Sequence, residues 1–520
     1  MKKGFTLIEL LAVILILGII ALIAIPTVNN ILKESRRGAF QSTLTNLEKA
    51  VEEKCTTEQI KNQEITTMYT ISGGVISPSL DIKGELPDGV IYVSKDCEVS
   101  FTLSDNNFTG TKEVGGEIVI VDKGNNNAVT VYKEAILNGT DPVLSDNMIP
   151  VTIANDGTVT KADINTKWYS YAEKKWANAV ILTESGKVET DGTIKENSIK
   201  AYFVWIPRYK YQLFDMGNYD SFIEEQPIES KAKPIEIIFE NKNTPVSVGT
   251  EIGEYHSHPA FQAFDTNGLW VGKFETTGET TNLTIKPGLK ALVKLNAKNM
   301  IDAAFNFNRN SDSHLIKNTE WGAVAYLSHS KYGINDQVNI NNHSEYRTGF
   351  SSTVEQTIHH GITGTTSNVT LPYNTETGYK ASTTGNITGI YDMSGNAQDF
   401  VAAYKNVDLS SSGFDSEPAL IYGAKYFDVY PSDTDETLYK YRILGDATGE
   451  MGPFYYYKDT DQSYRKHNSW YYNSSRMVSD LSWFGRGGYN INSYLCGQFY
   501  FGRLAGISND NTAFRIVLAN

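Results

Sequence analysis

The sequence predicts an α+β protein that begins with one long helix. Three observations support this fold class. An apolar segment from Phe5 to Ile25 leads into a stripe of apolar residues at helical spacing. Short alternating runs follow between about residues 60 and 123, as is typical of antiparallel strands. The long remainder mixes strand-like and helix-like patterns and contains no solenoid or propeller repeat.

The apolar segment is long enough to cross a membrane. As a helix, residues 5–25 would span about 31 Å. No Ala-x-Ala cleavage site follows, so a secretory signal peptide does not fit. Beyond it, apolar residues recur at spacings of four, three and four, which is one face of a helix. They are Phe40, Leu44, Leu47 and Val51. We therefore predict one helix over about 5–55, apolar all round at first and amphipathic later.

Two residues do not fit a simple membrane anchor. Glu9 places a carboxylate in the apolar segment, where an ionisable side chain is costly and is usually paired. Pro26 would kink or locally unwind the helix. Basic residues both precede and follow the segment, so their positions alone do not orient it in a membrane.

The first residues carry a recognisable motif. From Lys2 to Glu9 the chain reads Lys-Lys-Gly-Phe-Thr-Leu-Ile-Glu, a short basic leader that ends in glycine and precedes the apolar helix. This start resembles that of type IV prepilins. The resemblance implies that a prepilin peptidase cleaves after Gly4 and that Phe5 is N-methylated. It also implies assembly with other pilin subunits, in which Glu9 neutralises the terminal amine of a neighbour. The precursor would lie in the cytoplasmic membrane, and the product in an extracellular pilus.

A small antiparallel sheet is the expected partner for the outer half of the helix. The strand-like runs are Val90–Val93, Val99–Leu103 and Glu117–Val121. Cys55 closes the helix and Cys97 lies in a turn. Outside the membrane the two can form a disulfide, and two free thiols are the alternative that their spacing leaves open. The Asn-rich residues 124–127 are a candidate linker.

The C-terminal part predicts a large α+β domain with few helices. Its strand-like segments are Ala201–Tyr211 and Gly268–Glu275, and its helix-like segments are Ile301–Phe307 and Thr319–Leu327. A strand, a turn and a strand are expected between Lys167 and Leu182. From Thr383 onward, Gly, Ser, Asn, Tyr and Asp dominate, which predicts ordered loops. The expected division is a leader over 1–4, a membrane and filament-core helix over 5–56, a β head over 57–135 and this domain over 136–520.

Four motifs in the C-terminal part resemble the formylglycine-generating enzyme family, which has a C-type-lectin-like fold. They are Leu315–Tyr326, Gly389–Phe400, Arg486–Gly488 and Ala513–Arg515. They occur in the order in which the family carries them, and the resemblance covers about 168–520. It implies that this domain has the C-type-lectin-like fold.

The chain differs from that family at residues needed for oxidase activity and at residues near its calcium site. Its oxidase activity needs two nearby cysteines that bind copper, whereas only Cys496 lies in the matching region. We therefore expect a non-catalytic binding domain, with a copper-dependent surface oxidase as the alternative. In the family, the Gly389–Phe400 neighbourhood helps to bind calcium. Asn396 and Asp399 can still supply oxygen ligands for Ca²⁺, and a metal-free turn stabilised by these side chains is the alternative. No other cofactor is expected.

The composition of the chain limits the classes of partner that we expect. The chain has 46 Lys and Arg against 60 Asp and Glu residues, a net charge of -14, so nucleic acid is not an expected partner. The pairs His256/His258 and His359/His360 lack a marked third metal ligand. There are 31 tyrosines, and the aromatic runs 454–457 and 469–473 would form a contact surface if exposed and core if buried.

Taken together, the two resemblances imply a type IV pilus subunit, with the C-terminal domain acting as an adhesin for a host-surface glycan or protein. A domain of about 350 residues has a radius of gyration near 20 Å, which would crowd the shaft of a filament and favours a minor subunit at the tip. The alternatives are a major shaft pilin with a decorative head, and a pseudopilin of a secretion or DNA-uptake system.

Overall fold

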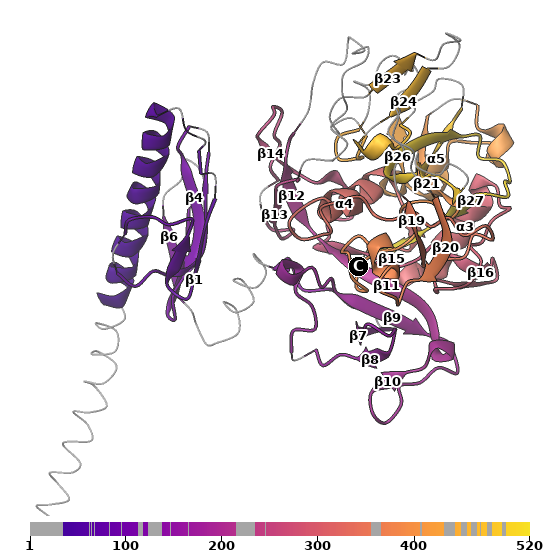
Figure 1. The fold of residues 1–520 in the computed structure, drawn as a ribbon, viewed down its shortest axis with the longest axis horizontal. Helices are drawn as coiled ribbons and strands as arrows, with labels where there is room; N and C mark the ends of the chain where they lie inside the picture. Colours follow the sequence, from indigo (N-terminus) through magenta and orange to yellow (C-terminus); the bar gives the residue numbers. More distant parts are fainter. Residues whose placement is uncertain are drawn as a thin grey trace, which may run out of the picture. The chain divides into compact units, whose positions relative to one another are not determined.

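The computed structural model describes residues 35–519 with internal gaps. The gaps are 62, 64, 67, 83, 95, 113–117, 123–137, 146, 165, 215–233, 245, 355–365, 406–407, 431–442, 449–454, 459–464, 469, 476–480 and 491–495. The predicted membrane segment and the linker at 124–127 therefore lie outside the described residues. The chain divides into an N-terminal unit, Met1–Glu134, and a C-terminal unit, Ala135–Asn520 (Figure 1). The described residues form a sheet-rich α+β fold, as predicted.

The N-terminal unit packs one helix along one face of a sheet (Figure 1). The described part of the helix covers residues 35–60, five residues past the predicted end at Cys55. All four residues of the predicted apolar stripe are at most 5% exposed, which confirms the amphipathic pattern. Burial of this stripe against the sheet is the main source of stability for such a helix.

The sheet of the N-terminal unit has six antiparallel strands in the order β2-β1-β3-β4-β5-β6, which confirms the predicted sheet. The strands are β1 (Met68–Ser72), β2 (Val75–Ser77), β3 (Asp88–Val93), β4 (Val99–Ser104), β5 (Phe108–Lys112) and β6 (Val119–Asp122). Alternate residues of β4, such as Phe101 and Leu103, face the core. At Gly110 a Cβ atom would lie 2.1 Å from Cδ1 of Leu44, so glycine permits the close approach of helix and strand.

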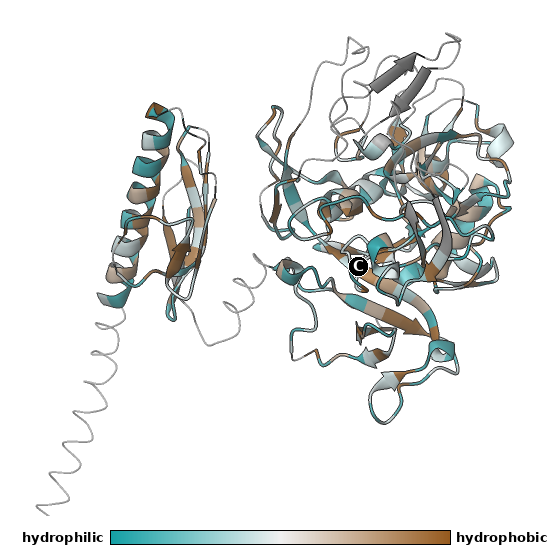
Figure 2. Ribbon diagram, in the orientation of Figure 1, coloured by the Kyte–Doolittle hydropathy of each residue, from teal (hydrophilic) through white to brown (hydrophobic). Residues whose placement is uncertain are grey.

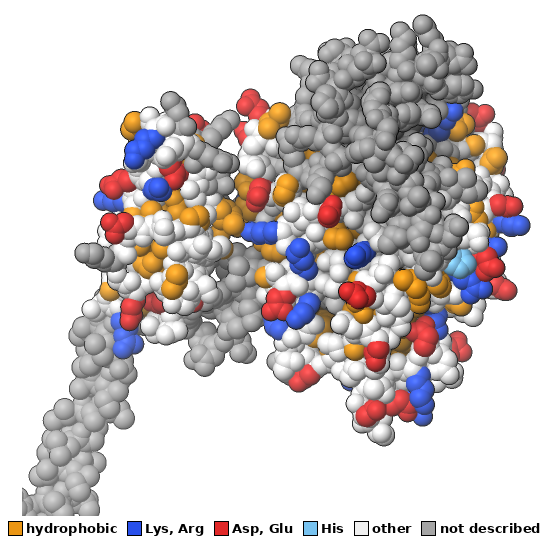
Figure 3. Space-filling model, viewed as in Figure 1, with side chains coloured by type: hydrophobic (Ala, Val, Ile, Leu, Met, Phe, Trp, Pro, Cys, Tyr) orange, Lys and Arg blue, Asp and Glu red, His pale blue; other side chains and the backbone are white. Residues whose placement is uncertain are grey.

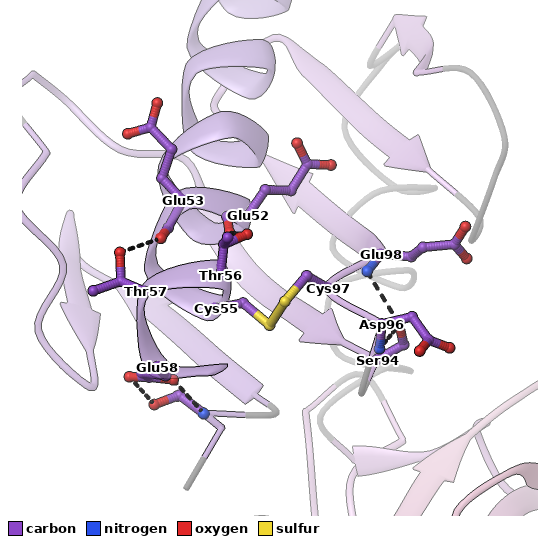
Figure 4. Close-up of a disulfide and its surroundings, with 11 residues drawn as sticks. Glu52, Glu53, Cys55, Thr56, Thr57, Glu58, Ser94, Asp96, Cys97 and Glu98 are labelled. Carbon is purple, nitrogen blue, oxygen red and sulfur yellow. Dashed lines mark hydrogen bonds between the residues drawn. A yellow bond between two sulfur atoms is a disulfide. The ribbon is translucent and has the colours of Figure 1, made fainter. Parts of the chain in front are cut away.

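A disulfide between Cys55 and Cys97 joins the helix to the turn between β3 and β4 (Figure 4). The two Cα atoms are 5.6 Å apart, and the cysteines are 42 residues apart in the chain. Cys97 has a φ of 62°, and its amide donates to the carbonyl of Ser94. The bond thus fixes one end of the helix–sheet interface covalently.

The C-terminal unit is built on an eight-stranded sheet in the order β10-β8-β7-β9-β11-β15-β28-β18. The strands are β7 (Met148–Ile153), β8 (Val159–Lys161), β9 (Asn178–Leu182), β10 (Thr193–Ile194), β11 (Ile199–Pro207), β15 (Gly268–Gly272), β18 (His314–Leu315) and β28 (Ile516–Leu518). Trp205 on β11 lies opposite Trp270 on β15, and both are fully buried. In Figure 2 the strands of both units carry much of the hydrophobic colour.

Two expectations for these strands need correction. The segment 201–211 is not one strand, because the chain leaves the large sheet after Pro207 and β12 (Tyr209–Gln212) joins another sheet. Arg208 at the break is buried and pairs with Glu240, with Nε 3.0 Å from Oε1. In the segment 167–182, only β9 is a strand, since Tyr171–Glu173 form a 3-10 turn that ends at the left-handed Lys174.

A second sheet lies within the segment after Thr383, where the sequence predicted ordered loops. Its strands run in the order β22-β21-β25-β26, and β27 also pairs with β21. They are β21 (Gln398–Lys405), β22 (Asp428–Tyr430), β25 (Trp483–Gly487), β26 (Gly497–Leu504) and β27 (Thr512–Phe514). Every residue of β21 is buried. A strand covered on both faces does not alternate in polarity, and so β21 lacks the pattern that reveals a half-exposed strand.

Two helices of the C-terminal unit, α3 (Ala297–Phe307) and α4 (Asn318–Ser328), contain the segments that the sequence predicts as helical. The short α5 (Pro418–Tyr422) was not predicted. The side chain of Asn296 caps α3 by accepting from the amide of Asn299 at 2.9 Å. Every residue of α4 is buried, which places this helix inside the core of the unit.

Smaller elements complete the C-terminal unit. The remaining strands are β13 (Ile237–Phe239) and β14 (Tyr255–Ser257), which flank β12, and the pairs β16 (Thr277–Glu279) with β17 (Asn282–Thr284), β19 (Phe350–Val354) with β20 (Thr366–Pro372), and β23 (Tyr455–Lys458) with β24 (Arg465–Asn468). The other 3-10 turns are η2 (Glu196–Ser198), η3 (Pro259–Phe261), η4 (Arg309–Ser311), η5 (Gly378–Ala381), η6 (Ser410–Ser412), η7 (Ala424–Tyr426) and η9 (Trp470–Tyr472).

Removal of the disulfide should destabilise the N-terminal unit. In the double variant Cys55→Ser/Cys97→Ser, the unfolded chain regains the freedom that closure of a loop of this length removes, about 4 kcal/mol. We expect the free energy of unfolding of this unit to fall by that order, measured by hydrogen exchange of the β3 and β4 amides in urea.

Cys496→Ser is the matched control, because it removes a thiol from the C-terminal unit and leaves the disulfide intact. Protection of β3 and β4 should be unchanged in this variant. Equal protection in the double variant and the wild type would show that the disulfide adds nothing to the helix–sheet core.

Candidate functional site

The residues of the N-terminal motif, Gly4, Phe5 and Glu9, lie outside the described part of the chain. Between residues 35 and 519, as far as they are described, no helix combines the length and apolar character needed to cross a membrane. The predicted span over 5–25 precedes this range. The site that can be built from atomic contacts therefore belongs to the C-terminal unit.

A cluster of buried polar side chains marks the region of the 389–400 motif. We call it the acid–arginine cluster; it consists of Glu275, Asp392, Asn396, Asp399 and Arg515, each at most 1% exposed. Glu275 follows β15, Asp392 and Asn396 belong to the turn before β21, Asp399 lies on β21, and Arg515 lies between β27 and β28. The cluster thus gathers groups from both large sheets.

Arg515 supplies the positive charge of the cluster. Its Nη2 lies 3.1 Å from Oδ2 of Asp399 and also donates to the carbonyl of Tyr391 at 3.0 Å. Its Nη1 donates to the carbonyl of Gly272 on β15 at 2.8 Å. The guanidinium therefore links the two sheets and neutralises one carboxylate, which a buried charge requires.

Amide groups donate to the other two carboxyls. Nδ2 of Asn396 donates to Oε2 of Glu275 at 3.0 Å. Nδ2 of Asn341 donates to Oδ1 of Asp392 at 2.9 Å, and the amide of Gly349 donates to both oxygens of Asp392. These contacts hold the segment 341–349 against the turn before β21.

Burial shifts the proton equilibria of all three carboxyls. Burial, reinforced by the charges of Asp399 and Asp392, raises the pKa of Glu275 well above its ordinary value. Burial raises the pKa of Asp392 to about 6, although Arg515 opposes the shift. Burial likewise raises the pKa of Asp399 to about 6 against the influence of Arg515. Burial therefore favours the protonated form of each carboxyl, and at Glu275 two neighbouring carboxyls add to this effect.

The donor set does not fit a calcium ion. Oδ1 of Asn396, Oδ1 of Asp399 and Oε1 of Glu275 are buried without a hydrogen-bond partner, and oxygens are the ligands that calcium prefers. However, in the described ranges no three Asp, Glu, His or Cys side chains gather closely enough to hold a metal ion. The guanidinium of Arg515 also occupies the other oxygen of Asp399. The geometry favours the metal-free turn that the sequence left as the alternative.

The backbone of the turn explains why the motif contains Asp, Gly and Asn. Asp392 and Asn396 have φ values of 61° and 59°, in the left-handed region that Asp and Asn enter more readily than most residues. At Gly395, with a φ of 79°, a Cβ atom would lie 2.4 Å from the carbonyl oxygen of Asn341. The motif therefore encodes a tight turn pressed against the 341–349 segment.

Cys496 lacks the properties of an activated thiol. It is fully buried, and its Sγ donates to the carbonyl of Tyr489 at 3.1 Å. Burial raises the pKa of this thiol, whereas nucleophilic and metal-binding cysteines have lowered values. The other two cysteines of the chain are joined to each other, so Cys496 has no second thiol with which to hold copper.

The other sequence candidates do not form sites among the described residues. His258 is fully buried among aromatic rings, and burial lowers its pKa well below the ordinary value. His314 is buried and pairs with Glu320, with Nε2 2.9 Å from Oε1. Trp470 and Tyr471 are buried, so this part of the aromatic runs is core. His359 and His360 lie outside the described residues.

Sequence reasoning missed three members of this region. The sequence places Glu275 at the end of a predicted strand and Arg515 in a Phe-Arg motif. Asn341 lies in none of the predicted elements or motifs. Arg515 was the residue with the clearest signal, since it belongs to a recognised motif. The partner of a buried side chain depends on the fold, which spacing along the chain does not reveal.

The raised pKa of Asp392 predicts a pH-dependent effect of the variant Asp392→Asn. A carboxyl with a raised folded pKa stabilises the fold most at low pH, and this contribution is lost as pH rises from the ordinary 3.8 to about 6. Asparagine does not titrate, so the variant has no stabilising contribution from this group that changes between these pH values. Its destabilisation relative to wild type should therefore be about 1–3 kcal/mol larger at pH 4 than at pH 7.

Urea unfolding of the C-terminal unit at both pH values provides the measurement. The buried histidines titrate alike in Asp392→Asn and in wild type. Their contribution, which changes with pH in the opposite direction, therefore cancels when the two free energies of unfolding are subtracted. Asp336→Asn, at an exposed aspartate, should differ from wild type by the same small amount at both pH values. A constant difference for Asp392→Asn would contradict the proposed proton uptake.

Comparison with known protein families gives a match at the N-terminus. Residues 1–25 match the prokaryotic N-terminal methylation motif. No curated protein gives a significant match to the chain. The match supports the start of a type IV pilin- or pseudopilin-type precursor, which in general is processed by a prepilin peptidase and assembles with other pilin subunits. Such a precursor is anchored in the membrane and then reaches a surface pilus.

Proposed function

We propose that this chain is a minor type IV pilin displayed at the tip of a pilus, and that its C-terminal unit is a non-catalytic binding module that acts as an adhesin. The methylation motif over residues 1–25 is the observation that carries the pilus assignment. In the mature chain, Glu9 would neutralise the methylated amine of Phe5 in a neighbouring subunit, because a carboxylate in an apolar core needs a cationic partner.

The N-terminal unit supports a structural role in a filament. Its helix uses one apolar face to cover the sheet and leaves its other face polar and exposed. The disulfide closes the helix–sheet interface (Figure 4). The exposed polar face suits a subunit head that is surrounded by water.

Contacts among the four motifs support the proposal that the C-terminal unit has a C-type-lectin-like fold. Arg486 of the third motif donates from Nη1 to Oδ1 of Asn318 in the first motif at 3.0 Å. Arg515 of the fourth motif pairs with Asp399 of the second. Segments that are far apart in the chain thus meet in buried polar contacts, as expected if the motifs are parts of one fold rather than chance matches.

The environment of Cys496 supports a binding role over catalysis. A buried thiol with a raised pKa and no second thiol lacks the reactivity that the related oxidase chemistry uses. A fold can also lose its catalytic residues and keep its recognition loops. We therefore assign no reaction to the C-terminal unit.

Immunogold electron microscopy of native pili tests the tip assignment. Antibodies against residues 168–520 should label the ends of filaments. Labelling along the whole shaft would instead identify a major subunit with a decorative head, and labelling absent from all filaments would favour a pseudopilin. Binding of labelled pili to host cells then tests the adhesin role.

Processing at the N-terminus gives a second prediction. The mature chain should begin with N-methylated Phe5, detected by mass spectrometry of the N-terminal peptide. In Gly4→Val the leader should remain attached, because the branched side chain replaces the glycine at the cleavage site. In Glu9→Ala, cleavage should persist while the amount of the chain in sheared pili falls at least about tenfold, since one buried charge loses its partner.

Glu53→Ala is the matched control, because Glu53 is an exposed carboxylate on the described part of the helix. It should be cleaved and incorporated as in wild type. Normal incorporation of Glu9→Ala would contradict the proposed pairing of Glu9 with a neighbouring amine.

A further inference from the structure

Four segments of the C-terminal unit meet at one surface. They are 289–294, 343–347, 489–490 and 509–510. The amide of Ala291 donates to the carbonyl of Tyr346 at 2.9 Å, and the amide of Lys294 donates to the carbonyl of Asn509 at 2.8 Å. Nδ2 of Asn490 donates to the carbonyl of His343 at 3.2 Å. These contacts join parts of the chain that are distant in sequence.

Two partly exposed tyrosines lie on this surface, which we call the Tyr346–Tyr489 surface. The hydrogen bond from Asn490 to His343 joins the two loops that carry these tyrosines. Burial raises the pKa of Tyr346, and Tyr489 and Asp510 add to this effect. Tyr346 has a φ of 53°, a left-handed conformation that is strained for a bulky residue. Such strain concentrates at sites of ligand binding, where the surrounding contacts keep a side chain in place.

Buried contacts fix both tyrosine-bearing loops. The amide of Asn490 donates to the carbonyl of Asn396 at 2.9 Å, and the amide of Asn396 donates to the carbonyl of Asn341 at 2.6 Å. The Tyr346–Tyr489 surface is thus anchored to the acid–arginine cluster beneath it. A surface ordered before binding loses less conformational entropy when a ligand binds.

The charges of the surface nearly cancel. Arg347 Nε lies 2.8 Å from Oε2 of Glu345, and Lys294 Nζ lies 3.5 Å from Oδ1 of Asp510. Burial lowers the pKa of His343, which keeps this side chain neutral at pH 7. Of the charged residues in the four segments, only Lys290 has no such ion pair here, and one cation is too little to select a polyanion. Figure 3 shows acidic and basic side chains interspersed on the described part of the visible face.

We propose that the Tyr346–Tyr489 surface binds an uncharged glycan. Tyrosine rings provide flat apolar faces for the C–H side of a sugar ring, and their hydroxyls donate and accept hydrogen bonds. The Glu345 and Arg347 side chains supply strong acceptors and donors for sugar hydroxyls. A protein partner fits less well, because the centre of a protein–protein interface is depleted of charged residues. The inference rests on the proposed adhesin function and names its ligand class.

A glycan array probed with pili that carry the full chain tests this proposal. Neutral oligosaccharides are printed beside their sialylated and sulfated forms. We expect binding to at least one neutral glycan. Tyr346→Asn, which keeps a residue that tolerates the left-handed backbone, and Tyr489→Ala should each reduce the affinity at least about tenfold. Arg347→Gln, at an exposed side chain, should weaken binding with normal thermal unfolding.

Tyr255→Ala is the matched control, because Tyr255 is a partly exposed tyrosine on β14, which pairs with β12 and does not belong to the four segments of the surface. It should bind as wild type does. Absence of binding to every neutral glycan, binding only to acidic glycans, or full binding by the Tyr346→Asn/Tyr489→Ala variant would overturn the proposal.

Adhesion to host cells separates this proposal from the proposed function. If wild-type pili adhere and the double tyrosine variant adheres equally, the chain is an adhesin that uses another surface. If deletion of the chain leaves adhesion of the bacteria unchanged, the adhesin function itself fails.

Discussion

The C-terminal unit depends on the buried ion pair between Arg515 and Asp399. Asp399 belongs to β21 in the five-stranded sheet, and Arg515 also donates to Gly272 on β15 in the eight-stranded sheet. Loss of either partner would leave a buried charge without compensation, which destabilises a protein by about 3–5 kcal/mol. One guanidinium therefore fixes how the two sheets meet, and with them the turn that carries Asp392 and Asn396.

An exposed face made several elements readable from the sequence, although the fully buried α4 was predicted as well. The stripe from Phe40 to Val51 and the strands β3 and β4 could be read from periodicity, because their polar faces meet water. The strand β21 was not predicted; it is buried throughout and mixes polar, small and aromatic residues. Its neighbours cover both of its faces, and that arrangement is a property of the whole fold.

The candidate site shows the same limit more sharply. Asn396 and Asp399 were found because they stand in a recognisable motif, and the structure places both in one buried cluster. Glu275 and Asn341 could not be found, since their role comes from contacts across the fold: Glu275 meets Asn396 from 121 residues away in the chain. The cationic partner of Asp399 is also decided by the fold, because the same carboxylate would suit calcium if Arg515 were elsewhere.

The use of Arg515 as the cationic partner of Asp399 affects both the stability of the C-terminal unit and the order of its surface loops. Arg515 is part of the chain, so its contacts with Asp399 and with the turn before β21 are always available. A protein that works outside the cell meets variable ionic conditions, which change the occupancy of a metal site but not a covalently supplied guanidinium. The strained Tyr346 can persist because this framework beneath it is permanent. The buried contacts then compensate for the strain and keep Tyr346 in its position.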